Sequence, residues 1–163
     1  MSGDRASVRA ATPRDGPALA ELRFRFRSEL TAPAEPADQF KARCAQWMAG
    51  RLAGDPRWHC WVAEGSQGIV GNLWLQVIEK IPNPAAAEPE SHGYITNVYV
   101  VPELRNGGVG ALLMEAALAW CREEGIDAAL LWPSERSRSF YARYGFVPRD
   151  DLFALRPVSK ERT

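Results

Sequence analysis

The sequence lacks a long apolar run, and no stretch of it approaches the ~20 consecutive apolar residues that a membrane-spanning helix needs. Its first ten residues, MSGDRASVRA, also lack the apolar core of a secretory signal peptide. Net charge is absent too, because 20 Lys and Arg balance 20 Asp and Glu, so no overall field favours a polyanion such as DNA or an acidic membrane. We therefore expect a soluble, cytoplasmic protein with no nucleic-acid and no membrane partner.

Cysteine is scarce, with 3 residues among 163. Cys44, Cys60 and Cys121 are widely spaced and lie among apolar residues, which is unlike a disulfide framework or a metal cluster. His59 precedes Cys60, but neighbours on a strand point to opposite faces, so the two cannot form a nucleophilic pair there. The sequence predicts three core thiols and no metal site.

The chain has the length of one ordinary domain, and no internal repeat is evident. We expect a short strand over 7–11, then a helix to about Leu30 that begins at Thr12-Pro13-Arg14-Asp15. After a proline-rich loop at 31–37, Asp38 is expected to cap a second helix that ends near 50–54. Each helix carries an apolar stripe, formed by Leu19, Leu22, Phe26 and Leu30 in the first and by Phe40, Cys44, Trp47 and Met48 in the second.

Two apolar, β-branched runs, 58–64 and 69–81, flank Gly65-Ser66-Gln67-Gly68 and predict a hairpin. The next segment, Pro82 to Gly93, carries three prolines and three alanines and predicts no regular structure. It is either an exposed turn at one end of the sheet or a lid over a substrate site, and we favour the exposed turn.

Residues 94–124 carry the most informative pattern, a β-branched strand that Pro102 ends, a glycine-rich turn at 105–110 and an amphipathic helix with Gly125 just past its end. The apolar helix face is expected to comprise Val109, Leu112, Leu113, Ala116 and Trp120. Glycines let a backbone approach a ligand closely, and a helix N-terminus favours an anion. The turn could equally be only a tight strand-to-helix connection.

The glycine spacing excludes two nucleotide-binding motifs. A Walker loop needs Gly-Lys-Ser/Thr, which is absent, and a dinucleotide fingerprint needs a third glycine where Leu113 stands. The remaining pattern, Arg-x-x-Gly-x-Gly on a strand–turn–helix, resembles the acyl-CoA motif of the GNAT N-acetyltransferase superfamily, Gln/Arg-x-x-Gly-x-Gly/Ala. Residues 140–146, FYARYGF, resemble the second signature of that family, an aromatic-Tyr pair that closes a helix before Gly-Phe.

The C-terminal third completes the predicted fold. A strand over 126–132 is expected to run parallel to the central strand, because a helix joins the two. Ser134 can cap a short helix that ends at Tyr144, and residues 146–147 and 152–155 predict a closing pair of strands. With the resemblance, these elements predict a single α+β domain over residues 1–163, in three α/β/α layers, whose central mixed, mostly antiparallel sheet is flanked by helices.

The resemblance implies an N-acetyltransferase that moves an acetyl group from acetyl-CoA to a small primary amine or to a peptide or protein amine, and a homodimer is common in the family. It places the pyrophosphate on the backbone N–H groups and the Arg105 side chain of the turn, and the pantetheine arm along the central strand, where a splay from the 126–132 strand leaves backbone groups unpaired. An N–H near Tyr99 or Val100 would polarise the thioester. Ser134 stands where many relatives carry an Asn that contacts the arm. The implied cofactor-binding residues are Val98, Tyr99, Val100, Arg105, Asn106, Gly107, Gly108, Val109, Gly110, Ser134 and Tyr141.

Tyr141 matches the family tyrosine that protonates the leaving thiolate, and a phenol suits this role because its reference pKa of ~10 is close to that of an alkyl thiol. The alternative is an aromatic side chain packed in the core, which is our interpretation of Tyr144.

The sequence departs from the family at the base that accepts the proton of the amine. Relatives often carry a carboxylate on the central strand, whereas this strand offers Thr96 and Asn97, which do not accept a proton usefully. The base is therefore unassigned among Glu79, Glu29, His92 and a water held by Asn97. The family builds its acceptor pocket from the first two helices, so the expected substrate contacts are Arg25, Glu29, Glu79 and Asn97. The missing carboxylate keeps open a second reading, an acyl-CoA-binding or sensing module with weak catalysis.

Overall fold

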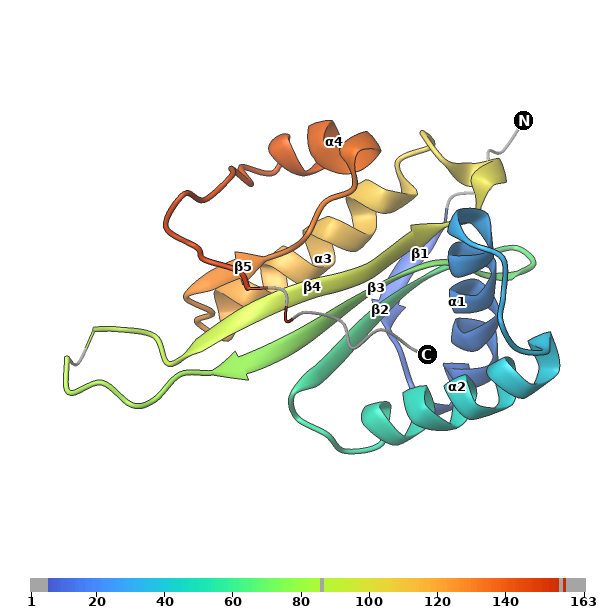
Figure 1. Ribbon diagram of the computed structural model, residues 1–163, viewed down its shortest axis with the longest axis horizontal. Coiled ribbons are helices and arrows are strands. Elements are labelled where there is room, and N and C mark those ends of the chain that lie inside the picture. The colour runs from blue at the N-terminus through green and yellow to red at the C-terminus, as the bar shows by residue number, and fades with distance from the viewer. Residues whose placement is uncertain (1–5, 86, 156, 158–163) are drawn as a thin grey trace. The chain divides into compact units, whose positions relative to one another are not determined.

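A five-stranded sheet in the order β1-β2-β3-β4-β5 organises the first of the two compact units of the chain, Met1–Leu131 (Figure 1). The strands are β1 Ser7–Ala10, β2 Trp58–Gly65, β3 Gly68–Glu79, β4 Ser91–Val100 and β5 Ala128–Leu130. The first three pairings are antiparallel and the β4–β5 pairing is parallel, which confirms the predicted mixed sheet. The computed structural model describes residues 6–85, 87–155 and 157.

Helices cover both faces of this sheet, which confirms the three predicted layers (Figure 1). The helical elements of this unit are the 3₁₀ turn η1 Pro13–Asp15, α1 Gly16–Leu30, α2 Ala37–Leu52, the 3₁₀ turn η2 Pro102–Leu104 and α3 Val109–Glu123. On the α1 and α2 side, Leu19 and Met48 pack with Cys60, Val62 and Trp74 in one buried cluster. The fold is an α+β sandwich of helices around one sheet.

Strand alternation separates His59 from Cys60, as predicted. Cys60 lies in the cluster under α1 and α2, whereas the His59 ring lies 4.1 Å from the ring of Trp120, which belongs to α3 on the other face. All three cysteines, which the structure describes, are free thiols, with Cys60 and Cys121 buried and Cys44 partly buried. Burial raises the pKa of both buried thiols, so neither is an activated nucleophile.

We therefore expect the Cys60→Ala and Cys121→Ala variants to keep wild-type turnover per folded molecule. Each substitution removes one buried sulfur, so the free energy of unfolding should fall by about 1 kcal/mol or somewhat more. Steady-state kinetics together with urea unfolding of each variant measures both quantities. Loss of turnover in a fully folded variant would indicate covalent catalysis and contradict this assignment.

The start of α1 is held by Asp15, a buried carboxylate at the end of η1. Arg9 of β1 donates two hydrogen bonds to it, at 2.8 Å and 3.0 Å, and the Thr12 backbone N–H donates a third at 2.7 Å. The Arg9 hydrogen bonds, with the Thr12 N–H, lower the pKa of Asp15 to about 2 although its burial acts in the opposite direction. The predicted helix start is confirmed, with Asp15 as its main polar anchor.

This anchor predicts a loss of stability in acid. The pKa of Asp15 is depressed in the folded state, so its contribution to the free energy of unfolding is fully present above the unfolded pKa near 4 and is lost as the pH falls toward 2. Because Arg9 is partly exposed, this contribution is about 1–2 kcal/mol. Asp15→Asn should flatten the fall in unfolding free energy between pH 4 and pH 2 relative to the wild type, as urea titrations would measure. The exposed Asp150→Asn serves as the control, and equal slopes for the wild type and Asp15→Asn would contradict the assignment.

Several predicted positions within these helices are wrong. Leu30 is 59% exposed rather than in the core, because α1 ends there, beyond the packed part of the sheet. Pro36, not Asp38, is the N-cap of α2. On α3 the buried face is rotated from the predicted one, because Leu112 is exposed and Ala116 and Trp120 are only partly buried. The buried residues of α3 are Val109, Leu113, Met114, Ala117 and Cys121.

The 82–93 segment is mostly an exposed turn, as favoured. Its described residues up to Glu90 have no helix or strand, but the last three belong to β4, where Ser91 pairs with Glu79. Figure 1 shows the turn protruding from the end of β3 and β4. The glycine-rich turn at 105–110 follows the opposite end of β4. The 82–93 turn therefore lies too far from it to favour the role of a lid over a site there.

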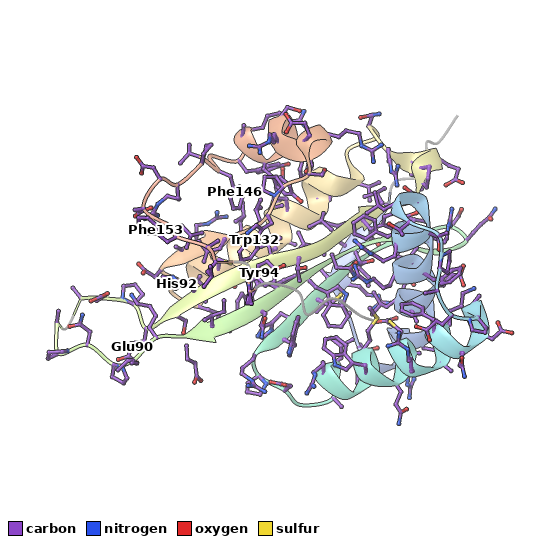
Figure 2. All side chains as sticks on the ribbon, viewed as in Figure 1. Glu90, His92, Tyr94, Trp132, Phe146 and Phe153 are labelled. Atoms are coloured by element: carbon purple, nitrogen blue, oxygen red, sulfur yellow. The ribbon has the colours of Figure 1, made fainter. Side chains whose placement is uncertain are left out.

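The second unit, Trp132–Thr163, contains the 3₁₀ turn η3 Glu135–Ser137 and the helix α4 Arg138–Ala142. Ser134 is the N-cap of η3 and Gly145 has a φ of 86°, so the predicted helix boundaries are close to those observed. The predicted strands at 146–147 and 152–155 are wrong, since the described part of this unit contains no strand. Short apolar runs form strands only when a neighbour takes their backbone hydrogen bonds. Phe153 is 95% exposed and projects from this irregular segment (Figure 2).

Candidate active site

The site is built around a bulge in the middle of β4. Thr96 pairs with Trp74 and Tyr99 pairs with Asn72, so two residues of β4 oppose one residue of β3, and Asn97 takes a left-handed conformation with a φ of 51°. The ladder between β4 and β5 covers only 92–94. Beyond Tyr94, backbone N–H and C=O groups on that edge of β4 have no β5 partner. The ladder ends where the family resemblance implies a splay, and the splay with its cofactor contacts stays a prediction.

Two side chains that sequence reasoning missed hold the bulge. The fully buried Asn72 donates from Nδ2 to the Asn97 carbonyl at 2.7 Å, and Arg23 of α1 donates from Nη1 to Asn97 Oδ1 at 3.1 Å. A polar residue in the middle of an apolar strand run was the available signal for Asn72. Arg23 carried none, because only tertiary packing brings α1 to this point of β4.

The turn at 105–110 continues from the same strand into α3. Asn106 and Gly108 have positive φ angles of 62° and 87°, and Gly108 is the N-cap of α3. The backbone of Leu112 donates to the Gly108 carbonyl at 3.1 Å, which leaves the N–H groups of the first helical turn without intrahelical partners. Gly107 is also confined, because a Cβ there would lie 3.3 Å from the Leu104 carbonyl oxygen. The turn is therefore a concentrated set of backbone donors at a positive helix end.

Glu29 connects this turn to α1. Its carboxylate accepts the Tyr99 hydroxyl at 2.6 Å and pairs with the Arg105 guanidinium at 2.8 Å, while Arg105 Nε donates to the Val100 carbonyl at 3.0 Å. Burial and the hydrogen bond to Glu29 raise the pKa of Tyr99 to about 12. Tyr99 is buried and its ring centroid lies 5.3 Å from that of Phe26, so its side chain packs against α1. Arg105 braces the turn against α1; its predicted anion contact stays a prediction.

The three side chains among the four base candidates do not converge on the bulge. Glu29 is engaged by Tyr99 and Arg105. His92 lies five residues before Asn97, which is about 16 Å along an extended strand, and Glu79 pairs with Ser91, about 20 Å away. Figure 2 shows Glu90, His92 and Tyr94 following one another at the start of β4. Of the candidates, a water held by Asn97 is the one consistent with this geometry.

The other expected substrate contact, Arg25, points elsewhere. Its Nη2 lies 3.5 Å from Glu103 Oε1, just before the 105–110 turn rather than beside Asn97. On a different face of α1, Arg27 and Ser28 line an open hollow of about 180 Å³ with Phe24, Pro33 and Phe40, between α1 and the segment that leads into α2. The Ser28 hydroxyl is buried and finds no hydrogen-bond partner within the described residues. A recess thus lies between α1 and the segment that leads into α2, and its role as an acceptor pocket stays a prediction.

The second unit contains Tyr141 and Ser134. Tyr141 is partly buried on α4, with its ring 5.2 Å from Phe140 and 5.9 Å from Phe146. Burial raises the pKa of Tyr141, so the phenol keeps its proton at neutral pH. Tyr144 is also partly buried, 5.4 Å from Phe140. The exposed Ser134 donates from Oγ to Ser137 Oγ at 2.9 Å, within its own turn.

The described residues show neither a metal site nor a membrane-spanning helix. None of their His, Cys, Asp or Glu side chains form a group of three or more that could hold a metal ion. Within 6–85, 87–155 and 157, no helix is both long enough and apolar enough to cross a bilayer. The described residues contain a strand edge without a β5 partner, which is followed by a turn whose backbone N–H groups could bind an anion at the start of α3.

Comparison with known proteins identifies the family to which the chain belongs. The model of the Acetyltransferase (GNAT) family matches residues 18–146, which include the bulge, the turn and α4. The chain belongs to this family. GNAT proteins use acetyl-CoA as their acyl donor. In this GNAT chain, the bulged strand and the glycine turn follow one another as in the motif that suggested the family.

Individual GNAT relatives agree. An uncharacterised N-acetyltransferase of Archaeoglobus fulgidus is 41% identical over 58 residues, which span 34% of this chain and 40% of that protein. The crystal structure of a GCN5-related N-acetyltransferase from Ralstonia eutropha JMP134 is 29% identical, with a TM-score of 0.71 over 92% of this chain and 97% of that one. A predicted acetyltransferase of Clostridium acetobutylicum, crystallised with acetyl-CoA, is 24% identical, with a TM-score of 0.76 over 93% and 96% of the two chains. The last comparison bears on the fold alone.

Proposed function

We propose that this protein is an acetyl-CoA-dependent N-acetyltransferase that moves the acetyl group directly to an amine. One observation carries the proposal: β4 has no β5 partner beyond Tyr94, and it leads through η2 into the Gly108 turn at the start of α3. A thioester arm with a pyrophosphate at its end needs these two features on one continuous segment, a strand edge for its amides and a cluster of N–H groups for its phosphates.

The cofactor residues follow from this segment. The backbone of Val98, Tyr99 and Val100 would bind the pantetheine arm, and an N–H at Tyr99 or Val100 would polarise the thioester oxygen. The backbone of 105–110, with Asn106 and Gly108 in positive φ conformations, would bind the pyrophosphate. Support comes from the shape of the turn, since a side chain at Gly108 would be strained. Ser134 and Tyr141 complete the proposed set on the second unit.

Transfer requires one bond to form and one to break. The amine nitrogen attacks the thioester carbon, the C–S bond breaks, and the departing thiolate takes a proton that we assign to the Tyr141 hydroxyl. The attacking amine must also lose a proton. We assign this proton to a water held by Asn97, because Glu29 is ion-paired and Glu79 and His92 lie far along the strand. Tyr141 is then the catalytic acid, and Asn97 is the substrate-side contact.

A second candidate function is favoured because positions 96 and 97 carry no carboxylate and because Glu29 is already bound to Arg105 and Tyr99. The same site could bind acyl-CoA as a sensing module with weak catalysis. It makes the same prediction for CoA binding and a different one for turnover.

A thiol-release assay separates the two functions. Purified protein is mixed with acetyl-CoA and an amine panel of amino acids, polyamines, aminoalcohols and lysine peptides, and free CoA is measured with a thiol reagent. Acceptor-dependent release, with an N-acetyl product seen by mass spectrometry, would establish a transferase. Calorimetric binding of CoA without any acceptor-dependent release would favour the sensing module, and no binding of CoA would exclude both.

Two further expectations remain proposals. A homodimer is expected because the family commonly forms one, and analytical ultracentrifugation measures it directly. A cytoplasmic location is expected from the sequence, and fractionation of cells that produce the protein tests it.

A further inference from the structure

Arg23 is a partly buried arginine with no carboxylate partner among the residues that the structure describes. Its contacts are the hydrogen bond from Nη1 to Asn97 Oδ1, at 3.1 Å, and the Phe26 ring, whose centroid lies 5.9 Å from the guanidinium carbon. Six other arginines of the same unit have carboxylate partners, namely Arg9, Arg25, Arg43, Arg51, Arg57 and Arg105. The arginines that show none besides Arg23 are exposed, namely Arg14, Arg27 and Arg122, among the described residues of this unit. Arg23 is thus a charge that the fold itself does not neutralise.

The surroundings of Arg23 make this charge costly. Burial, and then the like charge of Arg27 one helical turn away, lower the pKa of Arg23. A guanidinium nevertheless remains protonated in proteins, so the cost appears as an unfavourable free energy rather than as loss of the proton. Like charges four residues apart on a helix are themselves destabilising. An anion bound between the two arginines would relieve both terms.

The position of Arg23 links it to the proposed chemistry. Its hydrogen-bond partner Asn97 is the left-handed residue of the β4 bulge, next to the residues proposed to hold the thioester. Cys44 of α2 and Tyr94 of β4 also lie close enough to affect the charge of Arg23. The guanidinium therefore lies on the α1 and α2 side of the sheet, where β4 parts from β5.

We propose that the acetyl acceptor is a small amine that carries an anionic group, a carboxylate or a phosphate, and that Arg23 binds this group with help from Arg27. The inference rests on the proposed transferase function and specifies its substrate class. A guanidinium presents a planar fork that matches the two oxygens of either anion. Arg27 also lines the hollow between α1 and the segment before α2, which gives the body of a small acceptor space beside the anion site. The nearest carboxylate of that hollow, Glu35, is ion-paired with Arg43.

Matched acceptors test the substrate class. β-Alanine is compared with β-alaninamide, and O-phosphoethanolamine with ethanolamine, by kcat/KM with saturating acetyl-CoA. The anionic member of at least one pair should be preferred. In Arg23→Gln, which keeps a hydrogen-bond donor without the charge, kcat/KM for the preferred anionic acceptor should fall by about tenfold to hundredfold, mostly through KM. For the neutral acceptors kcat/KM should fall less than for the anionic one, because they lose only the support that Arg23 gives to Asn97. The exposed Arg14→Gln is the matched control and should change neither value.

A second measurement does not depend on turnover. The CoA-saturated protein is titrated with inorganic phosphate and with acetate, at constant ionic strength, and the melting temperature is recorded. Wild type and Arg14→Gln should show a saturable rise for at least one anion, and Arg23→Gln should lose it. No rise in the wild type, or an equal rise in Arg23→Gln, would overturn the anion site.

The two proposals fail in different ways. Acceptor-dependent release that ignores the charge of the acceptor and the Arg23 substitution would leave the transferase standing and remove the anionic class. An anion-dependent rise in melting temperature with no acceptor-dependent release would support the anion site and argue against the transferase. Preference for the carboxylate pair or for the phosphate pair identifies which anion the acceptor carries.

Discussion

Tyr141→Phe is expected to lower kcat by about 10²–10⁴-fold, the usual value of general acid catalysis, while KM for acetyl-CoA stays nearly constant. The substitution removes the hydroxyl that is proposed to protonate the leaving thiolate and keeps the ring that packs near Phe140 and Phe146. The Tyr141 hydroxyl makes no hydrogen bond within the described part of the chain, so its removal should leave no buried partner unsatisfied. Stopped assays and thermal unfolding on the same preparation measure both effects.

Tyr144→Phe provides the matched control, because it removes a hydroxyl from a neighbouring, partly buried tyrosine. It should keep kcat per folded molecule. If Tyr141→Phe instead loses roughly 1–3 kcal/mol of stability and its activity tracks the folded fraction, the tyrosine is structural. Full activity per folded molecule would remove Tyr141 from the mechanism.

Gly108→Asp is expected to abolish most of the affinity for CoA. Gly108 is the N-cap of α3 with a φ of 87°, a conformation that costs a residue with a Cβ about 1–2 kcal/mol. The new carboxylate would also lie beside the proposed pyrophosphate, and two like charges near a protein surface repel by about 1–4 kcal/mol at 4 Å. The dissociation constant of CoA, measured by calorimetry, should therefore rise by about tenfold to several hundredfold.

Two variants separate charge from strain. Gly108→Ala introduces the strain without the charge and should weaken CoA binding less. Gly125→Asp places the same side chain at a glycine with a φ of 66°, just past the other end of α3, and should lower stability but keep CoA affinity. A folded Gly108→Asp protein that binds CoA as tightly as the wild type would show that the pyrophosphate does not lie on this turn.

Local signals in the sequence were sufficient where the chain itself supplies the physical cause. Pro13 and Asp15 start a helix, Gly65 to Gly68 close a hairpin, and Gly108 and Gly125 bound α3, all within a few residues of the predicted places. Each of these depends on backbone φ angles or on hydrogen bonds between near neighbours. The order strand, turn and helix, with its glycine spacing, was enough to suggest the family as well.

Packing decided which faces and ends are buried. Periodicity predicted an apolar stripe on α3 that includes Leu112. In the structure Leu112 is exposed, and Met114 and Ala117 are buried instead, because packing against the sheet determines which face of α3 is buried. The same holds for the absent strands at 146–147 and 152–155. Their composition suits a strand, yet a strand also needs a neighbour for its backbone groups, and sequence composition does not specify a neighbour.

The sequence by itself determined the elements of the first unit, the turn that begins α3 and the resemblance to the GNAT family. These follow from residues that lie close together along the chain. Only the tertiary structure decided that Asn72 and Arg23 hold the bulge at Asn97, that Glu29 is engaged by Tyr99 and Arg105, and that His92 and Glu79 lie at the far end of β4. These relations join residues up to 76 positions apart, as Glu29 and Arg105 are. Such contacts depend on how α1, β3 and β4 pack, and no local pattern records that packing.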